Sequence, residues 1–368
     1  MLKNFLSTKY FILSSAFLSL LSCSSKETNP LAFTPPDLHK AKELKVTEIS
    51  KIEKESTGYI DIAVKDSLIV ATGSDFEYTQ HLFSKNSGEY LASIASMGRG
   101  PGEFITGLTY IHFTTGNDST YYIVHNPMST VYTCRFKDIL TNTLPIKFTR
   151  LCQPPGKFTG QLSFTDIIPV NDRIIATPAN KRINRNLFEL YDINGNLLDT
   201  FAVYPQIDEI KEKKLISEGM FMYARMTARP DGKRLVIGTN FGAYMGIYSL
   251  ENDTISLLSE NRYHIPKLYM KLYSNGGYII NQHDSNITGF TSFTSSQDKI
   301  YAVYYGRKFS LSDRLYYLLE YDWNGKLLKS HKFGSTIFDI TYNPDDNRVY
   351  FLYGNSSKGD YRIGYMEQ

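Results

Sequence analysis

The feature that most constrains the fold of this chain is a short segment that recurs in part 54 residues later. Residues 97–104 contain Pro101, Gly102 and Phe104, and residues 154–158 repeat the same three residue types as Pro155, Gly156 and Phe158. A constant offset held over several positions is the signature of a repeated structural unit. The sequence therefore predicts a repeat protein.

Each repeat is made of short runs of β-prone residues separated by turn residues. An acidic turn residue followed by a hydrophobic run occurs six times, at Asp66, Asp118, Asp172, Asp231, Asp298 and Asp346. In three units an asparagine and a glycine follow, at residues 86–88, 194–195 and 324–325. Asn-Gly between hydrophobic runs is a strong signal for a hairpin. Each unit is therefore expected to form four antiparallel strands.

Units of this kind and period are typical of propeller blades. We predict an all-β fold, a six-bladed β-propeller with four-stranded blades, over residues 45–368. The last unit supplies three strands, and residues 46–52 are expected to add the fourth, which removes a free edge and joins the two ends of the chain. Two alternatives are seven blades, because the gap between Asp231 and Asp298 is long, and tandem β-sandwiches.

The first residues predict export and a lipid anchor. Residues 1–22 carry two lysines and then an apolar run that is too short to span a membrane, which is typical of a signal peptide. They end at Leu21-Ser22-Cys23, which resembles the lipobox of bacterial lipoproteins, so Cys23 is expected to be acylated. Residues 23–44 contain three prolines and are expected to form a flexible tether. The alternative is an ordinary signal peptide.

Composition narrows the class of partner. Removal of residues 1–22 takes away Lys3 and Lys9, so 38 basic residues (40 − 2) remain against 37 acidic ones. A net charge of +1 does not favour a nucleic-acid partner. Of the cysteines that remain beside Cys23, we expect Cys134 and Cys152 to be unpaired, because the predicted register of their strands places them too far apart.

One segment carries a family resemblance. Tyr90-Leu91 followed by residues 98–104 is similar to the connector of NHL-type repeats, and the whole chain resembles the TolB-like six-bladed propeller lipoproteins of Gram-negative bacteria. The resemblance implies the propeller fold and a place in the cell envelope. Ser24 after the cysteine favours the outer membrane by analogy, with its periplasmic or surface face left open. The family has no general activity to transfer.

The candidate ligand site lies on one rim of the predicted propeller. Strand alternation places the connections between blades and the loops between second and third strands on that rim. Its charged candidates are Arg99, Glu103, Lys181, Arg182, Arg185 and Arg307. Arginines offer paired donors to carboxylate, sulfate or phosphate groups. The alternative is a solvated rim whose basic side chains are balanced by acidic ones.

The sequence contains no recognisable catalytic constellation. The seven histidines form no metal-binding motif, although His112 and His283 are candidates to approach the channel. We therefore expect a lipid-anchored binding or interaction propeller whose ligand is a glycan, an anionic small molecule or an envelope protein. The sequence does not indicate any particular cofactor. The alternative is a metal-dependent hydrolase, lactonase or lyase with its site at the channel mouth.

Overall fold

The computed structural model describes most of the chain beyond the predicted signal peptide. The described residues are 34–54, 56, 58–73, 75, 77–100, 103–104, 109–113, 120–125, 130–141, 146, 148–152, 164–178, 186–203, 223–272, 278–308 and 315–368. Cys23 lies outside them. Among the described residues, no helix is long and apolar enough to cross a bilayer.

Within this part of the chain, strands form five four-stranded sheets, one five-stranded sheet and one two-stranded sheet. The first two sheets comprise β3 (Tyr59–Lys65), β4 (Leu68–Gly73), β5 (Tyr78–Ser84) and β6 (Tyr90–Ser96), then β7 (Thr109–Phe113), β8 (Thr120–His125), β9 (Thr130–Arg135) and β10 (Thr149–Cys152). The next two comprise β11 (Phe164–Val170), β12 (Arg173–Pro178), β13 (Asn186–Asp192) and β14 (Leu197–Val203), then β15 (Ala224–Ala228), β16 (Arg234–Thr239), β17 (Tyr244–Glu251) and β18 (Thr254–Arg262).

The remaining sheets include the N-terminal strands. One comprises β21 (Ile287–Ser295), β22 (Lys299–Lys308), β23 (Tyr316–Asp322) and β24 (Leu327–Phe333) with β1 (Lys42–Glu43) at its edge. Another comprises β25 (Thr336–Asn343), β26 (Arg348–Asn355) and β27 (Asp360–Glu367) with β2 (Thr47–Lys51). The two-stranded sheet is β19 (Leu268–Leu272) with β20 (Tyr278–Gln282). The short helices are α1 (Phe136–Leu140) and the 3₁₀ helix η3 (Ser356–Lys358).

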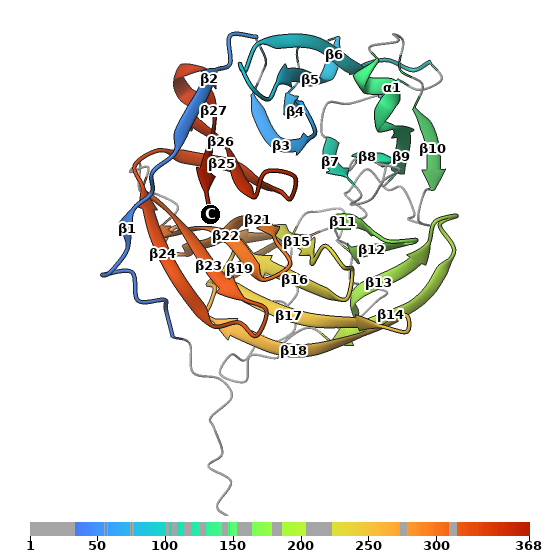
Figure 1. The fold of residues 1–368 in the computed structure, drawn as a ribbon. Coiled ribbons are helices and arrows are strands. Elements are labelled where there is room, and N and C mark those ends of the chain that lie inside the picture. The colour runs from blue at the N-terminus through green and yellow to red at the C-terminus, as the bar shows by residue number, and fades with distance from the viewer. Residues whose placement is uncertain are drawn as a thin grey trace, which may run out of the picture. The chain divides into compact units, whose positions relative to one another are not determined.

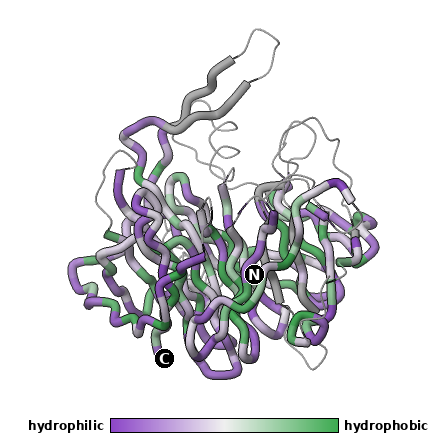
Figure 2. The backbone as a smooth tube through the Cα atoms, turned by 90° about the horizontal axis from the view of Figure 1, so that it is seen from above, coloured by the Kyte–Doolittle hydropathy of each residue, from purple (hydrophilic) through white to green (hydrophobic). Residues whose placement is uncertain are grey.

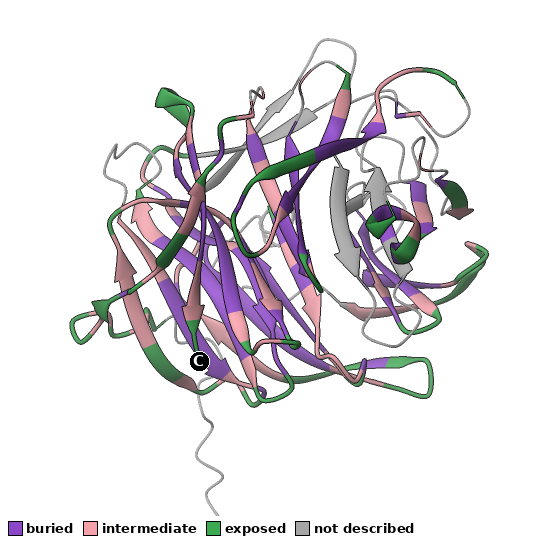
Figure 3. Ribbon diagram, turned by 45° about the horizontal axis from the view of Figure 1, so that its top comes forward, coloured by how far each residue is buried: buried purple, intermediate pink, exposed green. Residues whose placement is uncertain are grey.

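The sheets follow one another around a common centre, and their first strands face it (Figure 1). Six clusters of buried apolar side chains each lie between two neighbouring sheets of four or five strands, and one of these clusters joins the β3–β6 sheet to the β25–β27 sheet. The molecule is therefore an all-β propeller in which the first sheet packs against the last. Buried residues occupy the middle of the strands, and exposed, hydrophilic residues gather at the turns (Figures 2 and 3).

The turns form where the sequence predicted them. In the hairpin between β13 and β14, the Asp192 carboxylate accepts hydrogen bonds from the backbone N–H groups of Asn194 and Asn196, and Gly195 has a φ of 83°. Asp322 and Gly325 repeat this arrangement between β23 and β24. Glycine adopts this left-handed conformation without the strain that a side chain would add. Of the six predicted acidic turn residues, Asp118 lies outside the described residues.

The N-terminal strand closes the last sheet, as predicted. β2 pairs with β27 in an antiparallel ladder that places Thr47 opposite Tyr365. The chain before it is also held: β1 pairs in parallel with β24, and the buried Leu44 donates its N–H to the Lys332 carbonyl at 2.9 Å. The last part of the predicted tether, residues 34–44, therefore packs against the propeller instead of extending freely from it.

The conspicuous 97–104 segment is a connector between the first two sheets. Phe104 is almost completely buried and packs against the rings of Tyr132 and Phe148, with ring centroids 4.9 and 5.6 Å away. Phe104 therefore fills the core between the first two sheets. It forms an isolated bridge with Met97 and does not belong to β7, which starts at Thr109.

Candidate functional site: the central channel

The centre of the propeller contains a cavity of about 280 Å³. It is lined by five of the strands that face the centre, namely β3, β11, β15, β21 and β25. Each of these is the edge strand of its sheet, so one side of its backbone has no neighbour in its own sheet. Side chains on these strands must therefore satisfy part of the inward-facing backbone.

Four of the five strands carry a bulge just before a polar residue. The pairing register shifts immediately before Asp61, Asp166, Ser292 and Asp339, each on a different inner strand. A bulge changes the direction in which the following side chain points. β15 has no such shift, and Arg225 stands at the corresponding position, one residue before Met226.

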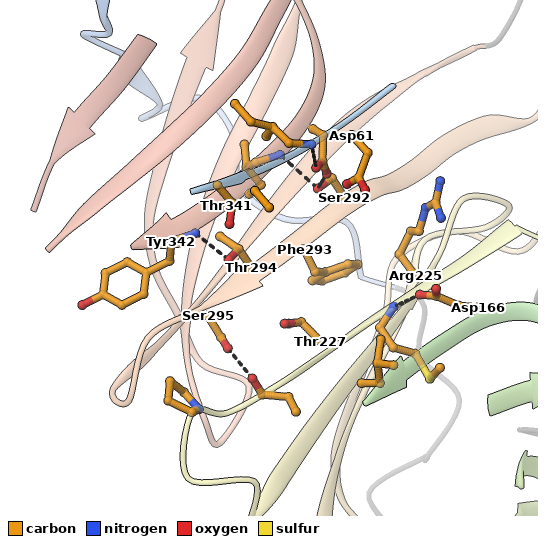
Figure 4. A pocket seen from close by; sticks show the side chains of 18 of the residues that line it. Asp61, Asp166, Arg225, Thr227, Ser292, Phe293, Thr294, Ser295, Thr341 and Tyr342 are labelled. Carbon is orange, nitrogen blue, oxygen red and sulfur yellow. Dashed lines mark hydrogen bonds between the residues drawn. The ribbon is translucent and has the colours of Figure 1, made fainter. Parts of the chain in front are cut away.

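Asp339 joins the last sheet both to the first sheet and to the sheet that precedes it in the chain. The Asp339 carboxylate accepts a hydrogen bond from the backbone N–H of Ile62 at 2.9 Å through Oδ2. Its Oδ1 accepts a hydrogen bond of 2.5 Å from the Ser292 hydroxyl on the preceding sheet. Ser292 Oγ in turn accepts from the N–H of Ile340 at 3.3 Å. Figure 4 shows these contacts at one end of the cavity.

Asp166 makes the same kind of contact between β11 and β15. Its Oδ2 accepts from the backbone N–H of Met226 at 2.7 Å, and its Oδ1 accepts from the N–H of Ile167 at 3.0 Å. We name Asp166, Ser292 and Asp339 the clasp residues, because each links its inner strand to the next one. Their polar atoms replace the backbone hydrogen bonds that two edge strands in different sheets cannot make.

Burial perturbs one clasp residue. Removal from water raises the pKa of the Asp166 carboxyl to about 6, and the nearby Asp339 carboxylate adds to this rise. Arg225 and the two N–H donors act in the opposite direction without reversing it. The rise therefore reflects removal of the carboxyl from water, which outweighs the attraction of the Arg225 guanidinium.

The other cations of the channel are balanced locally. Lys65 Nζ lies 3.2 Å from the Asp345 carboxylate, and Arg229 Nη2 lies 2.7 Å from the Asp231 carboxylate. Both acidic partners lie outside the cavity lining. Among the lining residues that the structure describes, three are acidic (Asp61, Asp166 and Asp339) and three are basic (Lys65, Arg225 and Arg229). With the two acidic partners outside the lining, acids outnumber bases by five to three around the described part of the cavity.

The predicted rim residues do not share one site in the described part of the structure. Arg99 is exposed in the connector after β6. Glu103 folds back under the same connector, where its carboxylate accepts the Gly100 N–H at 2.6 Å, and a Cβ added to Gly98 would lie 1.9 Å from it. Glu103 thus holds the shape of the loop. Lys181, Arg182 and Arg185 lie outside the described residues.

Arg307 lies away from Arg99. It was expected just after a strand but lies within β22, opposite Thr288, because bulges in β21 allow this ladder to continue to Lys308. The sheet that contains β25 stands between the sheets of Arg307 and Arg99. The described part of the structure therefore does not bring these two predicted ligand-binding residues together.

In the described part of the chain, the cysteine and histidine candidates do not form a catalytic or metal-binding site. Cys134 is buried and unpaired, as predicted, and burial raises its thiol pKa to about 12. His283 is an exposed turn residue that contacts Ser285, outside the cavity, and the side chain of His112 lies outside the described residues. Within the described residues, no three His, Cys, Asp or Glu side chains are grouped so that they could hold a metal ion.

The aspartates that line the channel were not among the predicted site residues. Asp61, Asp166 and Asp339 share one local signal, an aspartate directly before an isoleucine in the first strand of a unit. A charged residue in a buried strand needs hydrogen-bond or charged partners. Once the inner strands had been identified, this aspartate could therefore have been recognised as a residue with a specific role.

No curated protein matches the sequence. Solved structures that are similar to this chain include the computationally designed Ika8 protein (12% identity, TM-score 0.43, 87% of this chain and 100% of that chain). Another is the Cps50 (Swd1) β-propeller domain of Myceliophteria thermophila (11%, 0.43, 87% and 99%). A third is a functionally unknown protein from Desulfotomaculum acetoxidans DSM 771 (16%, 0.44, 81% and 80%).

A family model gives the assignment that these distant structures do not. The TolB-like 6-blade propeller-like model matches residues 43–345, which is most of the chain and begins within β1. The match agrees with the closed arrangement of sheets around a channel and with the resemblance seen in the connector after β6. The chain belongs to the TolB-like 6-blade propeller-like family.

Proposed function

We propose that this chain is a lipid-anchored, six-bladed binding or interaction propeller of the cell envelope. The observation that supports it most directly is the use of the channel acids. Asp166 and Asp339 bind backbone N–H groups on neighbouring inner strands at 2.7 and 2.9 Å, so they serve as joints of the propeller. Part of the accepting capacity of each carboxylate is therefore already used by buried donors that hold the propeller together.

The cavity supports a binding role. Propellers with a central channel hold small ligands where several sheets contribute polar groups to one enclosed space. Here five sheets contribute, and the wall is fixed by the clasp residues and by the Ser295 hydroxyl, which donates to the Ala228 carbonyl at 2.8 Å. Such a wall is organised before a ligand arrives, which lowers the entropic cost of binding.

The envelope location is supported by the lipobox-like sequence that ends at Cys23 and by the family, whose members are often associated with the envelope. The outer membrane is the proposed site of the anchor, because Ser24 follows the cysteine. The proposed ligands remain a glycan, an anionic small molecule or an envelope protein, with no nucleic acid.

The test combines metal analysis with an activity screen. Purified full-length protein is analysed for bound metal and incubated with sugar lactones and glycans. We expect no stoichiometric divalent metal and no product. Turnover that requires a tightly bound metal would instead support a metal-dependent hydrolase, lactonase or lyase.

A further inference from the structure

The cavity wall contains hydroxyl groups that the propeller itself does not use. Thr227 on β15 and Thr341 on β25 both line the cavity and are partly exposed, and among the described residues neither side chain forms a hydrogen bond. Figure 4 shows Thr227 directed into the space between Phe293 and Ser295. These hydroxyls differ from those of Ser292 and Ser295, which are engaged in bonds between sheets.

The wall offers both hydrogen-bond donors and hydrogen-bond acceptors. Inner edge strands present backbone N–H and C=O groups alternately, and only some of these groups are hydrogen-bonded to a clasp residue. A ligand that complements such a wall needs groups that both donate and accept. Alcohol hydroxyls have this property, whereas a carboxylate only accepts and an ammonium group only donates.

Charge argues against an anion. Asp61, Asp166 and Asp339 line the cavity, while Lys65 and Arg229 are paired with acids outside it. An anionic ligand would enter a space with excess negative charge and a low effective dielectric constant, where repulsion is stronger than in water.

Size sets the remaining limit. The volume of about 280 Å³ lies just below the range of about 300–1,000 Å³ that is typical of sites for drug-sized ligands. Water occupies about 30 Å³ per molecule in the liquid, so the cavity suits one small ring and a few waters.

We propose that the central channel binds a neutral polyhydroxylated ligand about the size of one sugar ring, with the hydroxyls of Thr227 and Thr341 among its contacts. This inference rests on the proposed binding function and narrows it from glycans and anions in general to a neutral ring in the channel. The predicted basic rim has no part in it.

The test is a titration with sugars of the same ring that carry a neutral, an acidic or a basic group. Full-length protein is titrated by calorimetry with neutral hexoses, and each hexose is compared with the uronic acid and the hexosamine of the same ring. We expect at least one neutral ring to bind, and its uronic acid to bind at least about tenfold more weakly. Tighter binding of the charged form would overturn the neutral class while leaving the binding propeller intact.

Variants locate the ligand. Thr227→Val and Thr341→Val remove one hydroxyl each at nearly constant volume and should weaken binding about three- to tenfold, as expected for the loss of one hydrogen bond. Thr288→Val is the matched control, because Thr288 also lies on an inner strand but outside the cavity lining. Thermal melts of all three confirm folding.

Each outcome decides the inference. Weakening by the two cavity variants and none by Thr288→Val supports it. Binding that none of the three changes would place the ligand elsewhere, and no binding of any neutral ring would overturn the proposal. Neither result would by itself contradict the broader binding function, which fails only if the protein turns over a lactone or glycan.

Discussion

Asp166 illustrates how a charged residue is kept inside the propeller. Only 4% of its surface is exposed, and its carboxylate is held by two backbone N–H groups and faces Arg225 and Asp339. These contacts position the group but do not compensate fully for its removal from water, since its pKa is raised from 3.8 to about 6.

The raised pKa predicts a specific pH dependence of stability. The folded state binds a proton at Asp166 more tightly than the unfolded state, so the contribution of this group is greatest below about pH 4 and is lost as pH rises through about 6. Relative to Asp166→Asn, the wild-type free energy of unfolding should fall by about 2.4 kcal/mol between pH 4 and pH 7. Urea unfolding at several pH values measures this difference.

Asp298→Asn serves as the control, because Asp298 is exposed in the turn after β21. Its difference from wild type should vary much less with pH. A wild-type curve that rises relative to Asp166→Asn over the same range would show that the carboxylate is stabilised by ionisation and would refute the assignment.

Glu103 and Gly98 should be energetically coupled. The Glu103 carboxylate occupies the space where a Cβ of residue 98 would lie, 1.9 Å from that position, and it accepts the Gly100 N–H. Gly98→Ala should displace the carboxylate and cost about 1 kcal/mol. In a Glu103→Ala background the same change should cost much less, and a double-mutant cycle by urea unfolding measures the coupling. Additive effects would contradict the described loop.

At the scale of single residues, the sequence predicted the types of side chain in a site better than it predicted where those side chains lie. The residue types of the rim suggested a ligand site, but Glu103 is used by its own loop. Arg99 follows a sheet that is not adjacent to the sheet of Arg307. The clasp residues Asp166 and Asp339 were overlooked because their partners on the neighbouring sheets, Met226 and Ile62, are 60 and 277 residues away in the sequence.

At the scale of secondary-structure elements, the N-terminal strand closes the ring of sheets. β2 completes the sheet of β25–β27, and Gly364 on β27 allows its close approach: a Cβ there would lie 2.6 Å from Val46 Cγ1 and 2.7 Å from the Thr47 carbonyl oxygen. Glycine in a strand often marks such an approach of another backbone.

Gly364→Ala should therefore weaken the closure. Because the backbone of β2 must move, we expect a loss of about 1–3 kcal/mol and faster proteolysis within residues 34–51. Gly334→Ala is the matched control, since a Cβ at Gly334 meets nothing within 4 Å. Equal stability and equal protease resistance of the two variants would contradict the role assigned to β2.

Strands and hairpins were predictable because their signals are local. The alternation of apolar residues and the Asp-x-Asn-Gly turns identify β13 with β14 and β23 with β24 from the sequence alone. The α1 helix and β1 were not predicted. α1 is only five residues long and depends on burial of Phe136 and Ile139 between two sheets, and β1 contributes two residues whose pairing is visible only when β24 is in place.

At the scale of the whole molecule, the predicted membrane attachment depends on a single residue. Cys23→Ala should release the protein from the membrane or leave it as an unprocessed precursor, because a lipoprotein anchor requires the thiol. Fractionation of cells followed by mass determination measures both outcomes. If the variant remains membrane-bound and correctly processed, the lipoprotein proposal is wrong.

The most direct test of the account is the stability of Asp339→Ala. Asp339 links Ser292 on one sheet to Ile62 on the first sheet, so its removal leaves a buried N–H without its acceptor where the propeller closes. We expect the free energy of unfolding, measured by urea titration, to fall by about 2–3 kcal/mol, with no enzymatic turnover in either protein. A change within about 0.5 kcal/mol, together with loss of a measurable turnover, would show that this carboxylate serves catalysis and not closure.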